Sequence, residues 1–261
     1  MSRTERRRRT KEDLRFLERG FDCERPEAVQ VMALMRVMSE LIEESRAAGS
    51  IAPLMAFLHA NMLAAGRAAP RRAIACRMGC AHCCRAWVSA RAPEVLFAAA
   101  AVPRRELDAV RATLEATFQV TGALTVAERA RLAAPCPMLL DNRCRIYEAR
   151  PATCRNAVSA DAQICARAFA PGAADEDIPA PDFYMRLGRG YSVALAGALK
   201  RGGFAACSYE LNAALRLALA RADCESAWLA GEDVFAGVPI DPGSDPFEFA
   251  NNRRIYEAAW A

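Results

Sequence analysis

Four cysteines crowd into nine positions of this chain, at residues 76–84, which read CRMGCAHCC. Thiolates bind soft or borderline metal ions well, and thiols three or four residues apart can converge on one ion at little ordering cost. A disulfide framework or a thiol redox centre could also use such a cluster. With 261 residues, however, the chain can bury a core without disulfides. We therefore interpret the cluster as metal-binding.

Most of the remaining cysteines lie in the same part of the chain. Eight of the eleven fall between residues 76 and 165, and only three lie outside this window. The eight predicted metal ligands are Cys76, Cys80, Cys83, Cys84, Cys136, Cys144, Cys154 and Cys165. We predict that the other three, Cys23, Cys207 and Cys224, are small buried residues.

The first twenty residues are charged throughout and lack the apolar segment of a secretory signal. No run of about 18 apolar residues follows, so we expect no membrane-spanning helix. These features predict a cytoplasmic protein with reduced thiols and no membrane partner. The basic run at residues 6–9 could contact RNA or an anionic surface. A frayed, solvated tail is the favoured interpretation, and we expect no nucleic-acid partner.

The apolar periodicity predicts an all-α or nearly all-α protein, with helices packed around an irregular cysteine-rich loop region. Residues 136–155 differ, because proline and an Asp-Asn turn there indicate a tight loop or small hairpin that leads into one helical turn. We expect a charged tail at 1–25, a helical metal-binding domain at 26–170, and a C-terminal helical segment at 171–261 that packs on it. The predicted helices cover residues 26–49, 53–66, 93–101, 104–118, 125–134, 185–203 and 209–231, with a last short helix after the tail at 238–249.

The cysteine spacing leaves several site arrangements open. C-x3-C-x2-C is the spacing of the three-cysteine cluster in radical SAM enzymes, but those need a barrel of alternating strands and helices, which this pattern does not predict. Adjacent side chains usually point in different directions, so Cys83 and Cys84 are expected to diverge, with one of them serving a second metal, a larger cluster or redox chemistry. Two four-ligand sites, one cluster plus a zinc ion, or a seven-plus-one arrangement would all use eight thiols.

Three elements follow one another along the chain: C-x3-C-x2-C-C, C-P-x-L and C-x-I-Y-x-x-R-P-x-x-C-R. They comprise Cys76, Cys80, Cys83 and Cys84; Cys136, Pro137 and Leu139; and Cys144, Ile146, Tyr147, Arg150, Pro151, Cys154 and Arg155. In this order they resemble the YkgJ-type cysteine-cluster family of zinc- or iron-chelating proteins, over about residues 76–155. The resemblance implies metal chelation without naming a reaction. The chain resembles more loosely the cysteine-rich core of bacterial flagellin lysine N-methylases, where an iron–sulfur centre is implied.

Arginines flank the predicted ligands, and two of them fall on motif positions. Four thiolates on Zn²⁺ or on a [4Fe–4S]²⁺ cluster leave a net charge of about −2, which is costly to bury without compensation. We therefore predict that Arg150 and Arg155 contact the ligand thiolates or the carbonyls of the ligand loops and compensate the negative charge of the bound metal group. The other flanking arginines are interpreted as surface residues: Arg77, Arg85, Arg143 and Arg145.

Both iron–sulfur and zinc suit this set of thiols. The C-x3-C-x2-C spacing with a distant Cys-Pro favours a 4Fe–4S cluster, because zinc seldom needs a vicinal cysteine pair, whereas C-x2-C beside other pairs suits zinc. Three functions follow: a metal-cluster protein that transfers electrons to a protein partner or catalyses a reaction, a zinc-stabilised binding module, or a metal chelation and storage device. The chain has only two histidines, His59 and His82, so few side chains are available for histidine-based acid–base catalysis. Whether the chain is an enzyme stays open.

Overall fold

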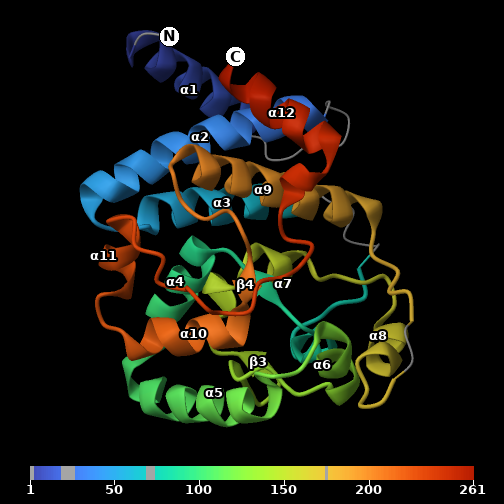
Figure 1. Cartoon of the computed structure of the whole chain (residues 1–261). Helices are drawn as coiled ribbons and strands as arrows, with labels where there is room; N and C mark the ends of the chain where they lie inside the picture. The colour runs from blue at the N-terminus through green and yellow to red at the C-terminus, as the bar shows by residue number, and fades with distance from the viewer. Residues whose placement is uncertain (1–2, 19–26, 69–73, 174–175) are drawn as a thin grey trace.

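The computed structural model describes residues 3–18, 27–68, 74–173 and 176–261. Within these ranges the protein is mostly α-helical, as the apolar periodicity predicts (Figure 1). The helices are α1 (Arg3–Leu17), α2 (Glu27–Ala48), α3 (Ala52–Ala68), α4 (Ala92–Ala100), α5 (Leu107–Thr121), α6 (Val126–Leu132), α7 (Ala152–Asn156), α8 (Ala162–Ala168), α9 (Asp182–Arg201), α10 (Leu211–Ala220), α11 (Cys224–Leu229) and α12 (Ala250–Trp260). The 3₁₀ turns are η2 (His82–Arg85), η3 (Arg104–Glu106), η4 (Tyr147–Ala149) and η5 (Pro246–Glu248).

Two pairs of very short antiparallel strands accompany the helices. Strand β1 (Ser89–Ala90) pairs with β4 (Tyr209–Glu210), and β2 (Leu139–Leu140) pairs with β3 (Arg143–Cys144). Asp141 and Asn142 connect β2 to β3 with positive φ angles of 50° and 60°. Positive φ at both central residues defines a type I′ turn, which Asn and Asp tolerate better than most residues. The hairpin predicted from the Asp-Asn turn is therefore confirmed.

The centre of the core is the contact between α2 and α9. Met35 and Met38 on α2 are fully buried, which confirms that their helical spacing reflects core packing. Gly197 on α9 allows the two helices to approach, because a Cβ atom there would lie 2.5 Å from the Met35 sulfur. Helix α2 ends at Ala48, and Gly49 follows it with a φ of 67°, which suits glycine. Both its length and its end agree with the sequence prediction.

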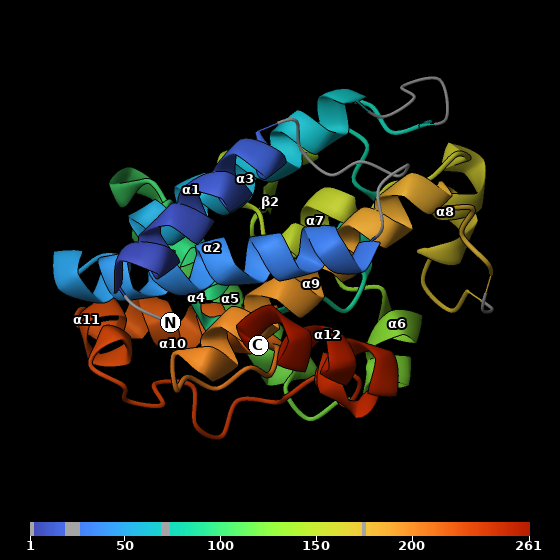
Figure 2. The ribbon, with the colours of Figure 1, turned by 90° about the horizontal axis from the view of Figure 1, so that it is seen from above.

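Helices α1 and α12 both pack on α2 and lie at the same end of the molecule (Figure 1), on opposite sides of α2 when seen from above (Figure 2). The expectation of a solvated N-terminal tail is wrong for residues 3–17. There α1 buries Leu17, and the Asp13 carboxylate accepts two hydrogen bonds of 2.6 Å from the Arg36 guanidinium on α2. Apolar burial and this ion pair order the helix despite its charge. Residues 19–26, with Cys23 and the predicted boundary at 25, lie outside the described residues.

The C-terminal part departs from the prediction at one point. The helix expected over 209–231 begins with β4 and is then divided into α10 and α11. The break falls at Arg221, whose φ and ψ of −116° and 110° are extended. Its guanidinium forms ion pairs with Asp223 and Glu232, which hold the chain in this turn. No helix in the described ranges has both the length and the apolar character that crossing a bilayer requires.

The close approach at Gly197 can be tested by substitution. We expect Gly197→Val to lower the free energy of unfolding by about 1–3 kcal/mol, because the added methyl groups would overpack the buried Met35. Gly66 on α3 is a matched control, since a Cβ there meets no atom within 4 Å. Urea denaturation of Gly197→Val, Gly66→Val and Gly197→Val with Met35→Ala measures the effect. Equal losses in the two single variants would contradict the packing argument.

Candidate metal centre

A buried carboxylate connects the helical core to the cysteine region. Glu94 on α4 is 2% exposed, and its Oε1 accepts a hydrogen bond of 2.7 Å from the backbone N–H of Ala152, the first residue of α7. Its Oε2 accepts a hydrogen bond of 2.9 Å from the N–H of Arg91. Two residues into α7 lies Cys154, and the hydroxyl of Thr153 donates to the carbonyl of Ser89 on β1. Helix α7 is thus held against the core at its first turn.

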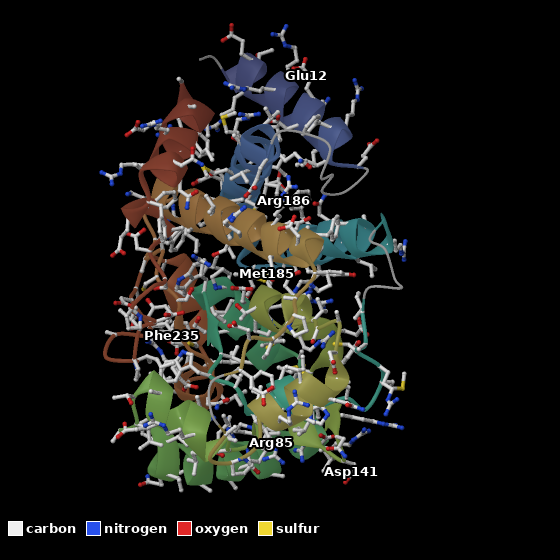
Figure 3. The ribbon with its side chains drawn as sticks, turned by 90° about the vertical axis from the view of Figure 1, so that its right-hand side faces the viewer. Glu12, Arg85, Asp141, Met185, Arg186 and Phe235 are labelled. Atoms are coloured by element: carbon white, nitrogen blue, oxygen red, sulfur yellow. The ribbon has the colours of Figure 1, made fainter. Side chains whose placement is uncertain are left out.

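The first four cysteines lie on a tight loop. Gly79 has a φ of 81°, and the N–H of Cys80 donates to the carbonyl of Arg77 at 3.0 Å, so the chain reverses between Cys76 and Cys80. The 3₁₀ turn η2 follows and carries Cys83 and Cys84. Figure 3 shows Arg85, the last residue of η2, at the end of the molecule opposite Glu12 on α1.

The second half of the motif is joined to this loop through the backbone. The N–H of Cys136 donates to the carbonyl of Cys84 at 2.7 Å. The β2–β3 hairpin then places Cys144 opposite Leu139. The hairpin turn at Asp141 lies at the same end of the molecule as Arg85 (Figure 3). Residues about 50 positions apart in the sequence therefore form one region.

Cys165 is the last predicted ligand and lies on α8, which packs against η2. Asp161 caps this helix by accepting hydrogen bonds from the N–H groups of Gln163 and Ile164. The backbone N–H of Ala75 donates to the carbonyl of Ser159 at 2.8 Å, which ties the start of the cysteine loop to the chain just before α8. Cys165 is therefore positioned by packing, outside the motif that first indicated the site.

Mutual electrostatic effects group the thiols into two sets. Burial raises the pKa of the Cys76 thiol, a hydrogen bond from Ser159 lowers it, and Cys80, Cys83 and Cys165 raise it further. Burial also raises the pKa of Cys154, as do Cys136, Cys144 and, more weakly, Cys83. Two thiol sets follow, and Cys83 is close enough to influence both. The upstream set is Cys76, Cys80 and Cys165; the downstream set is Cys136, Cys144 and Cys154.

The vicinal pair lies on the short η2 turn, where the two thiols influence each other. Interaction with the Cys84 thiol is the largest cause of the raised pKa of Cys83, followed by burial. The expectation that the two side chains diverge stays a prediction. The pair stands at the junction of the two thiol sets.

Arg129 on α6 is a buried cation beside the downstream set. It is 2% exposed, and its Nε and Nη1 have no hydrogen-bond partner among the described residues. Its charge lowers the pKa of Cys136 against a larger rise caused by burial, and it also lowers the pKa of Glu210. No sequence prediction singled out Arg129. The capping pair Thr125 and Glu128 marks the start of α6, but only the packing of α6 shows that Arg129 faces inward.

Arg150 and Arg155 lie behind the ligand loops. The charge of Arg150 lowers the pKa of Cys83, Cys144 and Cys154, while its Nε donates to the carbonyl of Tyr147 at 3.1 Å. Arg155 donates from Nε to the carbonyl of Arg150 at 3.1 Å and from Nη2 to that of Glu148. These bonds fix the segment that leads into Cys154.

The four other flanking arginines divide into two groups. Arg77 and Arg143 are exposed, as expected. Arg145 is not a surface residue, because its side chain is only 14% exposed and lies 3.6 Å from the Glu106 carboxylate. Arg85 is also partly buried and donates to the carbonyl of Ala133 at 2.9 Å. The interpretation of these two as surface residues was wrong, because α6 and η3 fold over them.

The remaining candidates lie away from the two thiol sets. Burial and the nearby Arg155 charge lower the pKa of His59 to about 4, so it is a neutral ring, packed edge-on against Phe97 at 5.2 Å. Cys224 is buried as predicted, whereas Cys207 is only partly buried.

All ten described cysteines are free thiols. In the same ranges, no three Cys, His, Asp or Glu side chains meet closely enough to hold a metal ion, so the thiols lie near one another without forming a finished site.

Comparison with known proteins gives one match. Residues 75–169 match the model of the family described as "CxxCxxCC: Putative zinc- or iron-chelating domain". The matched region contains all eight cysteines of the two sets and the vicinal pair, and it also includes Arg129. No curated protein and no solved structure matches the chain.

The pKa of Cys136 allows a test in the metal-free protein. Burial raises this pKa from 9.0 to about 11, so the folded protein holds the proton more tightly than the unfolded chain. The resulting stability is present below pH 9 and is lost as the pH rises from 9 to 11. Because each pKa unit corresponds to about 1.4 kcal/mol, we expect a loss of roughly 2–3 kcal/mol.

The measurement compares wild-type protein with Cys136→Ala by urea denaturation in reductant and chelator, between pH 7 and pH 11. The difference in free energy of unfolding between the two proteins should shrink above pH 9. A difference that stays constant over this range would show that the Cys136 thiol ionises alike in the folded and unfolded states.

Proposed function

From the zinc- or iron-chelating domain at residues 75–169, we propose that the chain is a cytoplasmic metalloprotein whose cysteine thiols hold two iron–sulfur clusters used for electron transfer. The observation that carries this proposal is the buried positive charge of Arg129 against the downstream thiols. A buried guanidinium without a bonded anion is costly, and neutral thiols do not compensate it. Thiolates bound to a metal group, which together carry a negative charge, would do so.

The structure fits a thiolate centre in its charge distribution. Burial keeps the thiols of Cys136 and Cys154 protonated at neutral pH, so metal binding must release their protons. Arg129 then stands beside the Cys136 thiolate, and Arg150 stands near the thiols of Cys83, Cys144 and Cys154. Glu210 is influenced by the charge of Arg129, but no ion pair joins the two side chains in the part of the chain that the structure describes, and the Glu210 Oε2 accepts the N–H of Ala213 at 2.6 Å.

We assign the ligands by the two sets. The upstream thiols (Cys76, Cys80 and Cys165) and the downstream thiols (Cys136, Cys144 and Cys154) each need a fourth ligand for an all-cysteine site. The vicinal pair can supply one cysteine to each, because it lies between them. This division explains why two adjacent cysteines are present, which a single tetrahedral zinc site would not require.

The other residues of the site hold the ligand loops in place. Arg155 binds the carbonyls of Glu148 and Arg150, and Glu94 binds the first N–H of α7, so Cys154 is oriented from two sides. An iron–sulfur cluster would supply one-electron transfer when bound. Exposed apolar side chains on the cysteine loops could meet a redox partner: Met78, Leu140 and Tyr147 are 89%, 47% and 55% exposed. Zinc with a structural role is the alternative that the C-x2-C spacing favours.

Metal and acid-labile sulfide should be measured on protein produced without oxygen. We expect brown protein that contains iron and sulfide in equal amounts. In Cys154→Ser the metal content should fall by about half, because one of the two sites loses a ligand. The matched control is Cys224→Ser, a buried cysteine outside the sets. Colourless protein with stoichiometric zinc and no sulfide would refute the electron-transfer proposal.

The compensating role of Arg129 has its own test. In Arg129→Met, removal of an unpaired buried charge should leave the metal-free protein as stable as wild type or more so. The same variant should bind metal roughly tenfold more weakly, because the thiolates lose a neighbouring cation. Chelator competition and urea denaturation measure the two effects. A loss of stability in the metal-free variant with unchanged metal affinity would show that Arg129 serves only packing.

A further inference from the structure

A hollow beside the ligand region is unexplained by metal binding. Its volume is about 220 Å³, and it lies between the end of α3, the first turns of α9, and α7 together with Arg150, two residues before that helix. Tyr184 and Leu187 line it from α9, on either side of Met185 and Arg186, which Figure 3 labels. The full lining is Met62, Leu63, Gly66, Arg67, Arg150, Arg155, Asn156, Tyr184 and Leu187.

The charges around the hollow are all of one sign. Arg67, Arg150 and Arg155 line it, and no Asp or Glu does. In the part of the chain that the structure describes, none of these three guanidinium groups forms an ion pair with a carboxylate. Several arginines elsewhere in those ranges do form such pairs, as Arg36 does with Asp13 and Arg189 with Glu27. The three arginines therefore concentrate positive charge on one small space.

Two of these arginines, Arg150 and Arg155, are neighbours in the lining of the hollow, and the Nε of Arg155 lies 3.1 Å from the carbonyl oxygen of Arg150. The backbone holds both cations in place, because Arg155 donates to the carbonyl of Arg150 and Arg150 donates to that of Tyr147. An arrangement of like charges held by backbone bonds is typical of a site that receives an anion.

Donors remain available to such a ligand. Arg150 uses its Nε for the Tyr147 carbonyl, and its guanidinium lies 3.8 Å from the Tyr147 ring centre, which leaves both Nη groups without a protein acceptor in the described ranges. Arg67 is exposed at the mouth and makes no hydrogen bond to a described residue. Guanidinium groups with free donors bind carboxylate and phosphate oxygens in a two-pronged manner.

Part of the lining of the hollow is apolar. Met62 and Leu187 are 5% and 1% exposed, and Leu63 is 53% exposed at the rim. Gly66 adds no side chain, which keeps the mouth open. A volume of 220 Å³ is below the roughly 300–1,000 Å³ of sites for drug-sized ligands, so the space suits a small molecule.

We propose that this hollow binds a small organic oxyanion, with a carboxylate or phosphate head on Arg67, Arg150 and Arg155 and a short apolar body against Met62, Leu63 and Leu187. The inference does not depend on which metal the cysteines bind, or on whether they bind one. It assigns the protein a ligand site next to Cys154, in addition to the metal centre.

Calorimetric titration of the full chain, as purified and with its metal content measured, tests the site. The probes are benzoate and phenyl phosphate as the two anion types, benzamide as the neutral analogue, and inorganic phosphate as a head group without a body. We expect benzoate or phenyl phosphate to bind at least tenfold more tightly than benzamide and than inorganic phosphate. The tighter of the two anions identifies the head group. Equal binding of benzoate and benzamide, or no binding of either anion, would overturn the proposal.

Variants separate a built site from general attraction of anions. Arg67→Gln should weaken anion binding about tenfold, as expected for loss of one charged hydrogen-bond donor. Leu63→Asp should abolish it by placing a carboxylate at the rim. Both positions are exposed, so folding should be preserved, which the thermal unfolding midpoint checks. Arg105→Gln removes the same charge from an exposed residue outside the hollow and should change nothing. An equal loss in Arg105→Gln and Arg67→Gln would refute the site.

Discussion

The hydrogen bonds of Glu94 are the constraint on which the cysteine region depends. This buried carboxylate binds the N–H of Ala152 at the start of α7 and the N–H of Arg91 at the start of α4. Arg91 is itself buried, and its guanidinium donates to the carbonyls of Ala206 and Ser244 and to the Ser192 hydroxyl. One polar network therefore links α4, α7, α9 and the C-terminal segment. A buried network of this kind stabilises the fold only when its members are satisfied together.

This network gives the metal region a rigid side and a less constrained side. Cys154 stands on α7, which Glu94 and Thr153 hold against the core. Cys76 and Cys80 stand on a loop whose contacts are a few backbone hydrogen bonds, and Cys76 is exposed. On metal binding we therefore expect the upstream loop to move more than α7. Coupling of metal binding to local ordering is common where ligands are near one another but not yet assembled.

Charge provides the second organising principle of the region. Burial raises the pKa of the Cys136 and Cys154 thiols, so they are protonated and neutral in the metal-free protein. Arg129, Arg150 and Arg155 nevertheless place positive charge near them. Neutral thiols leave that charge uncompensated, whereas thiolates around a metal group would balance it. The hollow beside Arg155 is lined by arginines as well, so positive charge also faces a space outside the ligand loops. Metal chelation and anion binding would thus use neighbouring parts of one cationic region.

The sequence by itself determined the helical class, the position of most helices, the Asp-Asn hairpin and the similarity of the cysteine region to a zinc- or iron-chelating domain. These features depend on local periodicity, turn residues and spacing, which act over a few residues. Only the tertiary structure decided that α1 is ordered, that α8 with Cys165 packs against η2, and that Arg129 and Arg145 face inward. Each of these depends on packing between segments far apart in the chain. Local spacing carries no information about such contacts, because burial and charge pairing arise only when the helices meet.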